Sequence, residues 1–168
     1  RMLSNLNSEP EPLLQLVLVG QPELRETLRQ PRLRHLVQRI WIDHHLEALE
    51  RAETRALIRH RLEVAGGPAD LVDEEAAAAI HHFARGLPRL VNALGEMALL
   101  QAYAEEAAQV DFDTVVDVVA ERQRAGGLTD FAELPADLPR AALRARILGD
   151  AEDAGKVLAP RWIQQAEG

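Results

Sequence analysis

Two polar residues of this chain stand where a side chain can contact a ligand. Gln21 directly follows the apolar run LLQLVLVG at 13–20, and an open α/β sheet presents its ligand-contacting side chains at such a strand end. Arg89 falls in the first turn of a predicted helix, where the helix dipole favours anions over cations. A residue that opposes its local preference indicates a function. The alternatives are a surface turn residue at Gln21 and a solvated arginine at position 89.

The histidines offer weaker chemistry. They occur as the pairs His44-His45 and His81-His82, with two more standing alone. Adjacent residues on a strand point to opposite faces. His44 and His45 therefore cannot easily coordinate the same metal ion. We therefore expect no metal site, and we expect the second pair to line the partly exposed flank of an alanine-rich helix.

The elements that position Gln21 are read as a piece of a βαβ sheet. The run 13–20 is too short to span a membrane, ends at glycine and proline, and has the composition of a central parallel strand. A helix kinked at Pro31 follows to about Val37, and RIWIDHHL at 39–46 reads as a second strand. The residues expected to face the sheet core are Leu14, Leu16, Leu18, Ile40 and Ile42.

From residue 49 onward the pattern is helical. Glycine, proline and N-cap residues divide it into four helices with short connections, predicted at 50–64, 73–84, 88–104 and from Asp111 or Asp113 to about 124. Residues 125–168 lose this periodicity, apart from one helical fragment near 139–148. We expect that last stretch to be a linker or a partly disordered tail.

Composition excludes several classes of function. The chain has 168 residues, 47% of them hydrophobic, which is enough to bury a core. It contains no cysteine, so disulfides and thiolate metal sites are excluded. Its longest apolar runs are far below the roughly 20 residues of a membrane span. A net charge of −8 disfavours sequence-independent binding of nucleic acid.

A phosphate loop is missing from these residues. No Gly-x-x-x-x-Gly-Lys-Ser/Thr occurs, and the nearest approach, at 149–157, has the wrong spacing and follows no strand. No aliphatic strand ending in Asp-Glu is present to hold magnesium. Since the chain opens on Arg1, we expect it to be cut from a longer protein. Because the phosphate loop and the magnesium carboxylates are lacking, we expect these residues by themselves to be inactive.

The series of motifs resembles the second half of an AAA+ ATPase of the general secretion pathway protein A type. The matching stretches are RMLSNL at 1–6, LVLVGQPELRETL at 16–28, LRHLVQRI at 33–40, HLEALERAETRALIRHRL at 45–62 and GLPRLVNALGEMALLQAYA at 86–104. The resemblance covers about residues 1–124. It implies an α/β remnant of a P-loop NTPase sheet at 1–48 and an all-α four-helix lid domain at 49–124, followed by the tail at 125–168, a mainly α chain.

This resemblance implies a role for each candidate residue. Gln21 is in the place of the sensor-1 residue, whose amide orients the attacking water or contacts the γ-phosphate. Arg89, with Pro88 and Gly86 in the same motif, is in the place of the sensor-2 arginine that reaches nucleotide phosphates from the lid. Arg39 is in the place of the arginine finger offered to a neighbouring subunit, with Arg32 and Arg34 as rivals.

The resemblance also implies partners and surroundings. The intact parent binds ATP and Mg²⁺, forms a homo-oligomer, and couples hydrolysis to the assembly or function of a secretion apparatus. It is expected on the cytoplasmic side, with any inner-membrane association made by parts of the parent outside these residues. Two alternatives remain open. One is a non-catalytic helical adaptor module, and the other is a transposition-type AAA+ ATPase, which needs a basic DNA-binding face.

Overall fold

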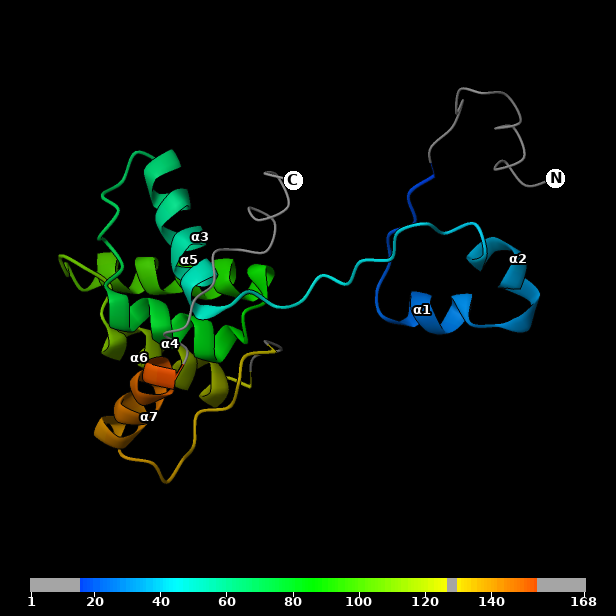
Figure 1. Ribbon diagram of the computed structural model, residues 1–168. Coiled ribbons are helices and arrows are strands. Elements are labelled where there is room, and N and C mark those ends of the chain that lie inside the picture. Colours follow the sequence, from blue (N-terminus) through cyan, green and yellow to red (C-terminus); the bar gives the residue numbers. More distant parts are fainter. Residues whose placement is uncertain (1–15, 127–129, 154–168) are drawn as a thin grey trace. The chain divides into compact units, whose positions relative to one another are not determined.

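The structure is a computed structural model that describes residues 16–126 and 130–153 (Figure 1). The chain divides into two compact units, the first ending at Leu46 and the second beginning at Glu47.

The described part of the first unit contains short helices. Helix α1 (Glu23–Leu28) begins after Pro22, and its first turn is closed by the N–H of Leu24, which donates to the carbonyl of Gln21 at 2.8 Å. A 3-10 turn, η2 (Pro31–Leu33), and helix α2 (Arg34–Val37) follow. None of these helices has a buried residue, so nothing among the described residues of this unit forms an apolar core.

Neither predicted strand is formed in the described residues. Residues 16–20 and 39–46 have no strand partner, and Leu16, Leu18 and Ile42 are 55%, 43% and 84% exposed instead of facing a sheet core. Ile40 is half-buried, and Leu14 lies outside the described residues. The physical reason is that a strand exists through its hydrogen-bonded neighbour. In the described part of the chain, the β pairing is a single isolated bridge between Val72 and Val110.

The second unit is helical. All four helices predicted between residues 50 and 124 are present. The helices are α3 (Arg51–Val64), α4 (Glu74–Ala84), α5 (Pro88–Ala104), α6 (Phe112–Arg124) and α7 (Arg140–Asp153).

Side-chain caps fix where three of these helices begin. Glu50 and Glu53 form a capping box at α3, in which the N–H of Glu50 donates to Oε2 of Glu53 at 2.9 Å. Asp73 caps α4 by accepting from the N–H of Ala76 at 2.6 Å. Asp111 caps α6 by accepting from the N–H and the hydroxyl of Thr114, and these hydrogen bonds lower the pKa of Asp111. The cap predicted at Asp111 or Asp113 is therefore Asp111.

Helix α4 is the centre of the core. It contacts α3, α5, α6 and α7 (Figure 1). Its buried residues are Ala76, Ala77, Ala78, Ala79, Ile80, Phe83 and Ala84. The alanines let neighbouring helices approach closely, while Ile80 and Phe83 fill the volume between them. A core in which many of the buried side chains are small agrees with a chain of 4% aromatic residues.

Part of the stretch expected as a linker or tail packs on this core. The N–H of Ala132 donates to the carbonyl of Phe83 at 2.8 Å, and Phe131 is buried. The helical fragment expected at 139–148 lies within α7, which buries Leu143 and Ile147 against the other helices. Residues 154–168 of the expected tail lie outside the described residues.

A half-buried histidine joins α3 to α4. Nδ1 of His81 lies 2.9 Å from the hydroxyl of Thr54, which is fully buried. Burial is the first cause that lowers the pKa of His81 below its ordinary 6.5, followed by the positive charges of Arg51 and His82. The neutral imidazole is therefore the form that fits between these helices.

The lowered pKa of His81 predicts that the folded protein loses stability as the pH falls. As the pH falls below 6.5, the unfolded chain binds the proton before the folded chain does. The stability that neutral His81 contributes is therefore complete above 6.5 and is lost as the pH falls through its lower folded pKa. We expect His81→Gln to flatten the pH dependence of the unfolding free energy between pH 7.5 and 5, measured by urea denaturation. His60→Gln, at an exposed site on α3, is the control, and equal slopes for both variants would contradict the prediction.

Candidate functional site

The turn between α4 and α5 carries three of the predicted site residues. Helix α4 ends with Arg85 and Gly86 in left-handed conformations, at φ 52° and 68°. The N–H of Gly86 donates to the carbonyl of His81 at 3.2 Å, which closes the last turn of α4. Leu87 is extended, and Pro88 begins α5. This sequence of conformations places Arg89 in the first turn of α5.

Gly86 has a steric reason to be glycine. The N–H of Leu49 donates to the carbonyl of Gly86 at 2.8 Å. A Cβ at Gly86 would lie well inside van der Waals contact of the Leu49 carbonyl oxygen and 3.1 Å from the Leu49 nitrogen. Gly86 and Pro88 thus shape the turn that carries Arg89, and their predicted contact with a nucleotide stays a prediction.

Arg89 is exposed at the N-terminus of α5. Its side chain is 81% exposed and lies 3.6 Å from the carboxylate of Asp130, which is 80% exposed. No side chain caps the N-terminus of α5, and no acidic residue lies in its first turn. The positive end of this helix and the guanidinium of Arg89 are each favourable for an anion.

Gln21 and Arg39 lie in the first unit. The side chain of Gln21 is exposed, and its backbone carbonyl accepts a hydrogen bond from the N–H of Leu24 in the first turn of α1. Arg39 follows α2 and is exposed, with its N–H donating to the carbonyl of Leu36 at 3.0 Å. Of its two rivals, Arg32 donates from Nε to Oε1 of Gln30 at 2.7 Å, and Arg34 is the first residue of α2. Their predicted roles stay predictions, since Arg89 belongs to the other unit.

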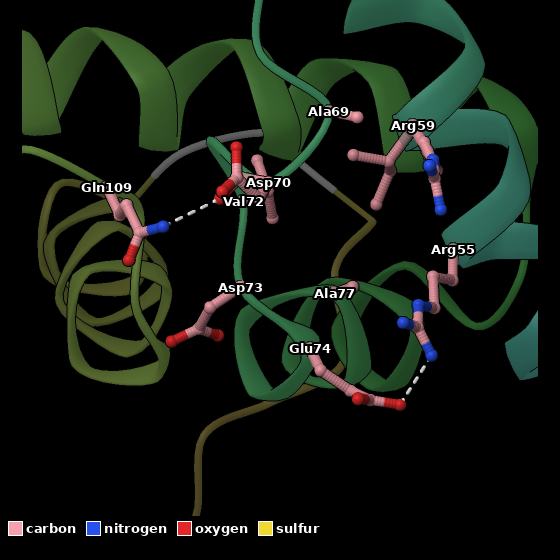
Figure 2. A pocket seen from close by; sticks show the side chains of 10 residues that line it. Arg55, Arg59, Ala69, Asp70, Val72, Asp73, Glu74, Ala77 and Gln109 are labelled. Carbon is pink, nitrogen blue, oxygen red and sulfur yellow. Dashed lines mark hydrogen bonds and ion pairs between the residues drawn. The ribbon is translucent and has the colours of Figure 1, made fainter.

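The structure also contains a hollow that sequence reasoning did not anticipate (Figure 2). A cavity of about 380 Å³ is lined by α3, the start of α4, the segment before α4 and Gln109. Within it Nη1 of Arg55 lies 2.5 Å from Glu74, and Nε2 of Gln109 donates to the carbonyl of Asp70 at 3.0 Å. Residues from such separate segments leave no spacing signal in a sequence. Because these polar groups pair with one another, the lining favours no particular ligand.

Residues 16–126 and 130–153 contain no group of three or more His, Asp or Glu side chains placed to hold a metal ion. In the same part of the chain, no helix combines the length and the apolar character needed to cross a membrane.

Comparison with known proteins gives one informative similarity. The chain is 41% identical over 110 residues to general secretion pathway protein A of Aeromonas hydrophila. The matched stretch is 66% of this chain and 20% of the relative, so the chain spans about a fifth of that protein's length. No protein-family model matches the chain, and no solved structure matches it.

The exposure of Arg89 predicts that its side chain contributes little to stability. We expect Arg89→Ala and Asp130→Asn each to change the unfolding free energy by less than about 0.5 kcal/mol, because exposed ion pairs are weak. Phe83→Ala, at a fully buried site, should cost about 3–5 kcal/mol in the same denaturation experiment. A loss at Arg89 close to that of Phe83→Ala would show that Arg89 is a structural residue.

Proposed function

We propose that this chain, a homologue of part of general secretion pathway protein A, is the sensor and helical lid portion of an AAA+ ATPase that serves a secretion apparatus. The observation that carries the proposal is the 41% identity over 110 residues. The ordered series of motifs from residue 16 to residue 104 supports it. In this proposal ATP hydrolysis by the intact protein drives assembly or function of the secretion apparatus.

The geometry around Arg89 supports a role on the nucleotide. An exposed guanidinium beside an uncapped helix N-terminus offers several donors to phosphate oxygens. The carboxylate of Asp130 lies 3.6 Å from this guanidinium. An exposed ion pair of this kind is worth about 1 kcal/mol or less, so it is a weak competitor for a phosphate. Arg89 is therefore proposed as the sensor-2 residue of its own subunit.

The first unit supplies the other two proposed residues. Gln21 is proposed to orient the attacking water, since its amide is exposed at the start of α1. Arg39 is proposed as the finger that reaches the nucleotide of a neighbouring subunit, which requires a homo-oligomer. Arg32 and Arg34 stay as alternatives.

Apolar exposure supports the sheet proposed at 1–48. Val17, Val19, Trp41 and Ile42 are 79%, 87%, 96% and 84% exposed, which is unusual for side chains of these types. Large apolar side chains so exposed favour a partner surface. We propose that residues 13–20 and 39–46 pair with further strands of a P-loop NTPase sheet in the intact ATPase.

The proposed cofactors are ATP and Mg²⁺, used by the intact ATPase. The donors at Arg89 fit the nucleotide's phosphates, whereas the described residues provide no cluster of carboxylates for Mg²⁺. ATP bound to the intact protein supplies the phosphoryl group that is transferred to water. Arg89 would neutralise phosphate charge, and Gln21 would hold the water in line. Secretion-apparatus components are the proposed partners, on the cytoplasmic side of the membrane.

A helical adaptor without catalysis is the second candidate. The second unit has its own core, centred on α4, and so contains what a binding module needs to fold. A transposition-type ATPase is less well supported, because a net charge of −8 opposes a DNA-binding face.

The proposed sheet predicts that the 168-residue chain exposes an apolar surface through which copies of the chain associate. We expect the chain to bind a hydrophobic dye and to associate as its concentration rises, measured by fluorescence and light scattering. Replacing Val17, Val19 and Ile42 together by serine should reduce both signals. Leu100→Ser, at a site on α5 that is 69% exposed, should leave them nearly unchanged. A monomeric chain with no dye binding would contradict the proposed sheet.

The two arginines predict different defects in the full-length ATPase. Arg89→Ala should weaken ATP binding within its own subunit. Arg39→Ala should leave binding intact and lower hydrolysis by about 10³- to 10⁵-fold, because a finger acts on the neighbour's transition state. Equilibrium ATP binding and steady-state phosphate release measure the two effects separately.

A mixing experiment provides the control. Arg39→Ala subunits mixed with subunits disabled in their own phosphate loop should regain some hydrolysis, at interfaces where an intact finger meets an intact pocket. Small and equal effects of both substitutions on hydrolysis would show that these arginines are surface residues. The proposal of a helical adaptor without catalysis would then be favoured.

A further inference from the structure

The segment that leads into the helical unit is held at the turn that carries Arg89. Leu49 lies two residues after the start of the second unit, and its N–H donates to the carbonyl of Gly86, three residues before Arg89. Glu50 caps α3 immediately afterwards. The start of α3 and the start of α5 are thereby joined by a hydrogen bond of 2.8 Å between backbone atoms.

This contact depends on Gly86 having no side chain. Its φ of 68° is unfavourable for other residues, and a Cβ would collide with the backbone of Leu49, which has no flexible end to move aside. The turn is also fixed on both sides of Gly86. The N–H of Gly86 donates to the carbonyl of His81, and the N–H of Leu87 donates to the carbonyl of Ala84 at 3.0 Å.

We propose that Gly86 is a positioning residue for Arg89, acting by docking the entering segment 47–50 on the α4–α5 turn. The docking fixes the place of Arg89 relative to the point where the chain enters the helical unit. The role in positioning rests on the proposed function of Arg89, whereas the docking stands on the backbone geometry alone.

A second glycine provides a matched control. Gly66 has a φ of 81°, and a Cβ built there meets nothing within 4 Å. Gly66→Ala therefore introduces similar backbone strain without a collision. Any difference between Gly86→Ala and Gly66→Ala reports the contact with Leu49 and not the left-handed conformation.

The docking is tested first on the 168-residue chain by amide hydrogen exchange. We expect the amide of Leu49 to be protected in the wild type and in Gly66→Ala, and to lose at least about tenfold in protection in Gly86→Ala. Protection of amides in α6 should be retained in all three. An unprotected Leu49 amide in the wild type would overturn the inference and leave the proposed function of Arg89 untouched.

The positioning role is tested on the full-length ATPase by measuring ATP binding. Arg89→Ala should weaken binding by about 10- to 100-fold, the range expected for loss of a charge-assisted hydrogen bond. Gly86→Ala should weaken it by a similar factor, Gly66→Ala should not, and the double variant Gly86→Ala/Arg89→Ala should bind no more weakly than Arg89→Ala. That absence of additivity would not arise from a general loss of stability.

The outcomes distinguish the proposed function of Arg89 from the positioning role of Gly86. If Arg89→Ala leaves ATP binding unchanged, the proposed function fails. If Arg89→Ala weakens binding while Gly86→Ala does not, or if their effects multiply, the positioning role alone fails. Should Gly86→Ala not fold, Leu49→Pro removes the N–H donor while keeping Gly86, and it must show the same lack of additivity with Arg89→Ala.

Discussion

Burial of α4 is the constraint on which the rest of the described helical unit depends. Its alanine-rich surface contacts α3, α5, α6 and α7, so the position of each is set by how closely it approaches that helix. The end of α4 then determines the turn at Arg85 and Gly86, and the turn determines where α5 begins. The exposed Arg89 is thus placed by a buried helix that it does not belong to.

The three residues of the candidate site differ in why each residue type occurs at its position. Gly86 and Pro88 have structural reasons for their identity, in the left-handed turn and the first position of α5. Arg89 has no such reason, because it is exposed at a helix end whose dipole disfavours a cation. The absence of a structural reason agrees with the proposed role of Arg89 on the phosphates of a nucleotide.

The two units differ in how far they are complete in the described residues. The second buries a continuous core, from Leu62 on α3 to Ile147 on α7. The first exposes Trp41 and Ile42 and has no β pairing among its described residues. The physical reason for the contrast is that a helix forms its backbone hydrogen bonds within itself, whereas a strand needs a neighbouring strand.

The sequence by itself determined the helices of the second unit, because caps such as Asp73, breakers such as Pro88 and the helical period act locally. It also predicted Arg89 as a candidate, from a charge that opposes the dipole. Only the tertiary structure decided that α7 packs on α4, since its three large apolar residues, Leu143, Ile147 and Leu148, do not distinguish a docked helix from a solvated one. The contact between Leu49 and Gly86 joins residues 37 positions apart, and the runs 13–20 and 39–46 lack strand partners in the described chain. Backbone pairing between distant residues depends on which segments the fold brings together, and no local pattern encodes that.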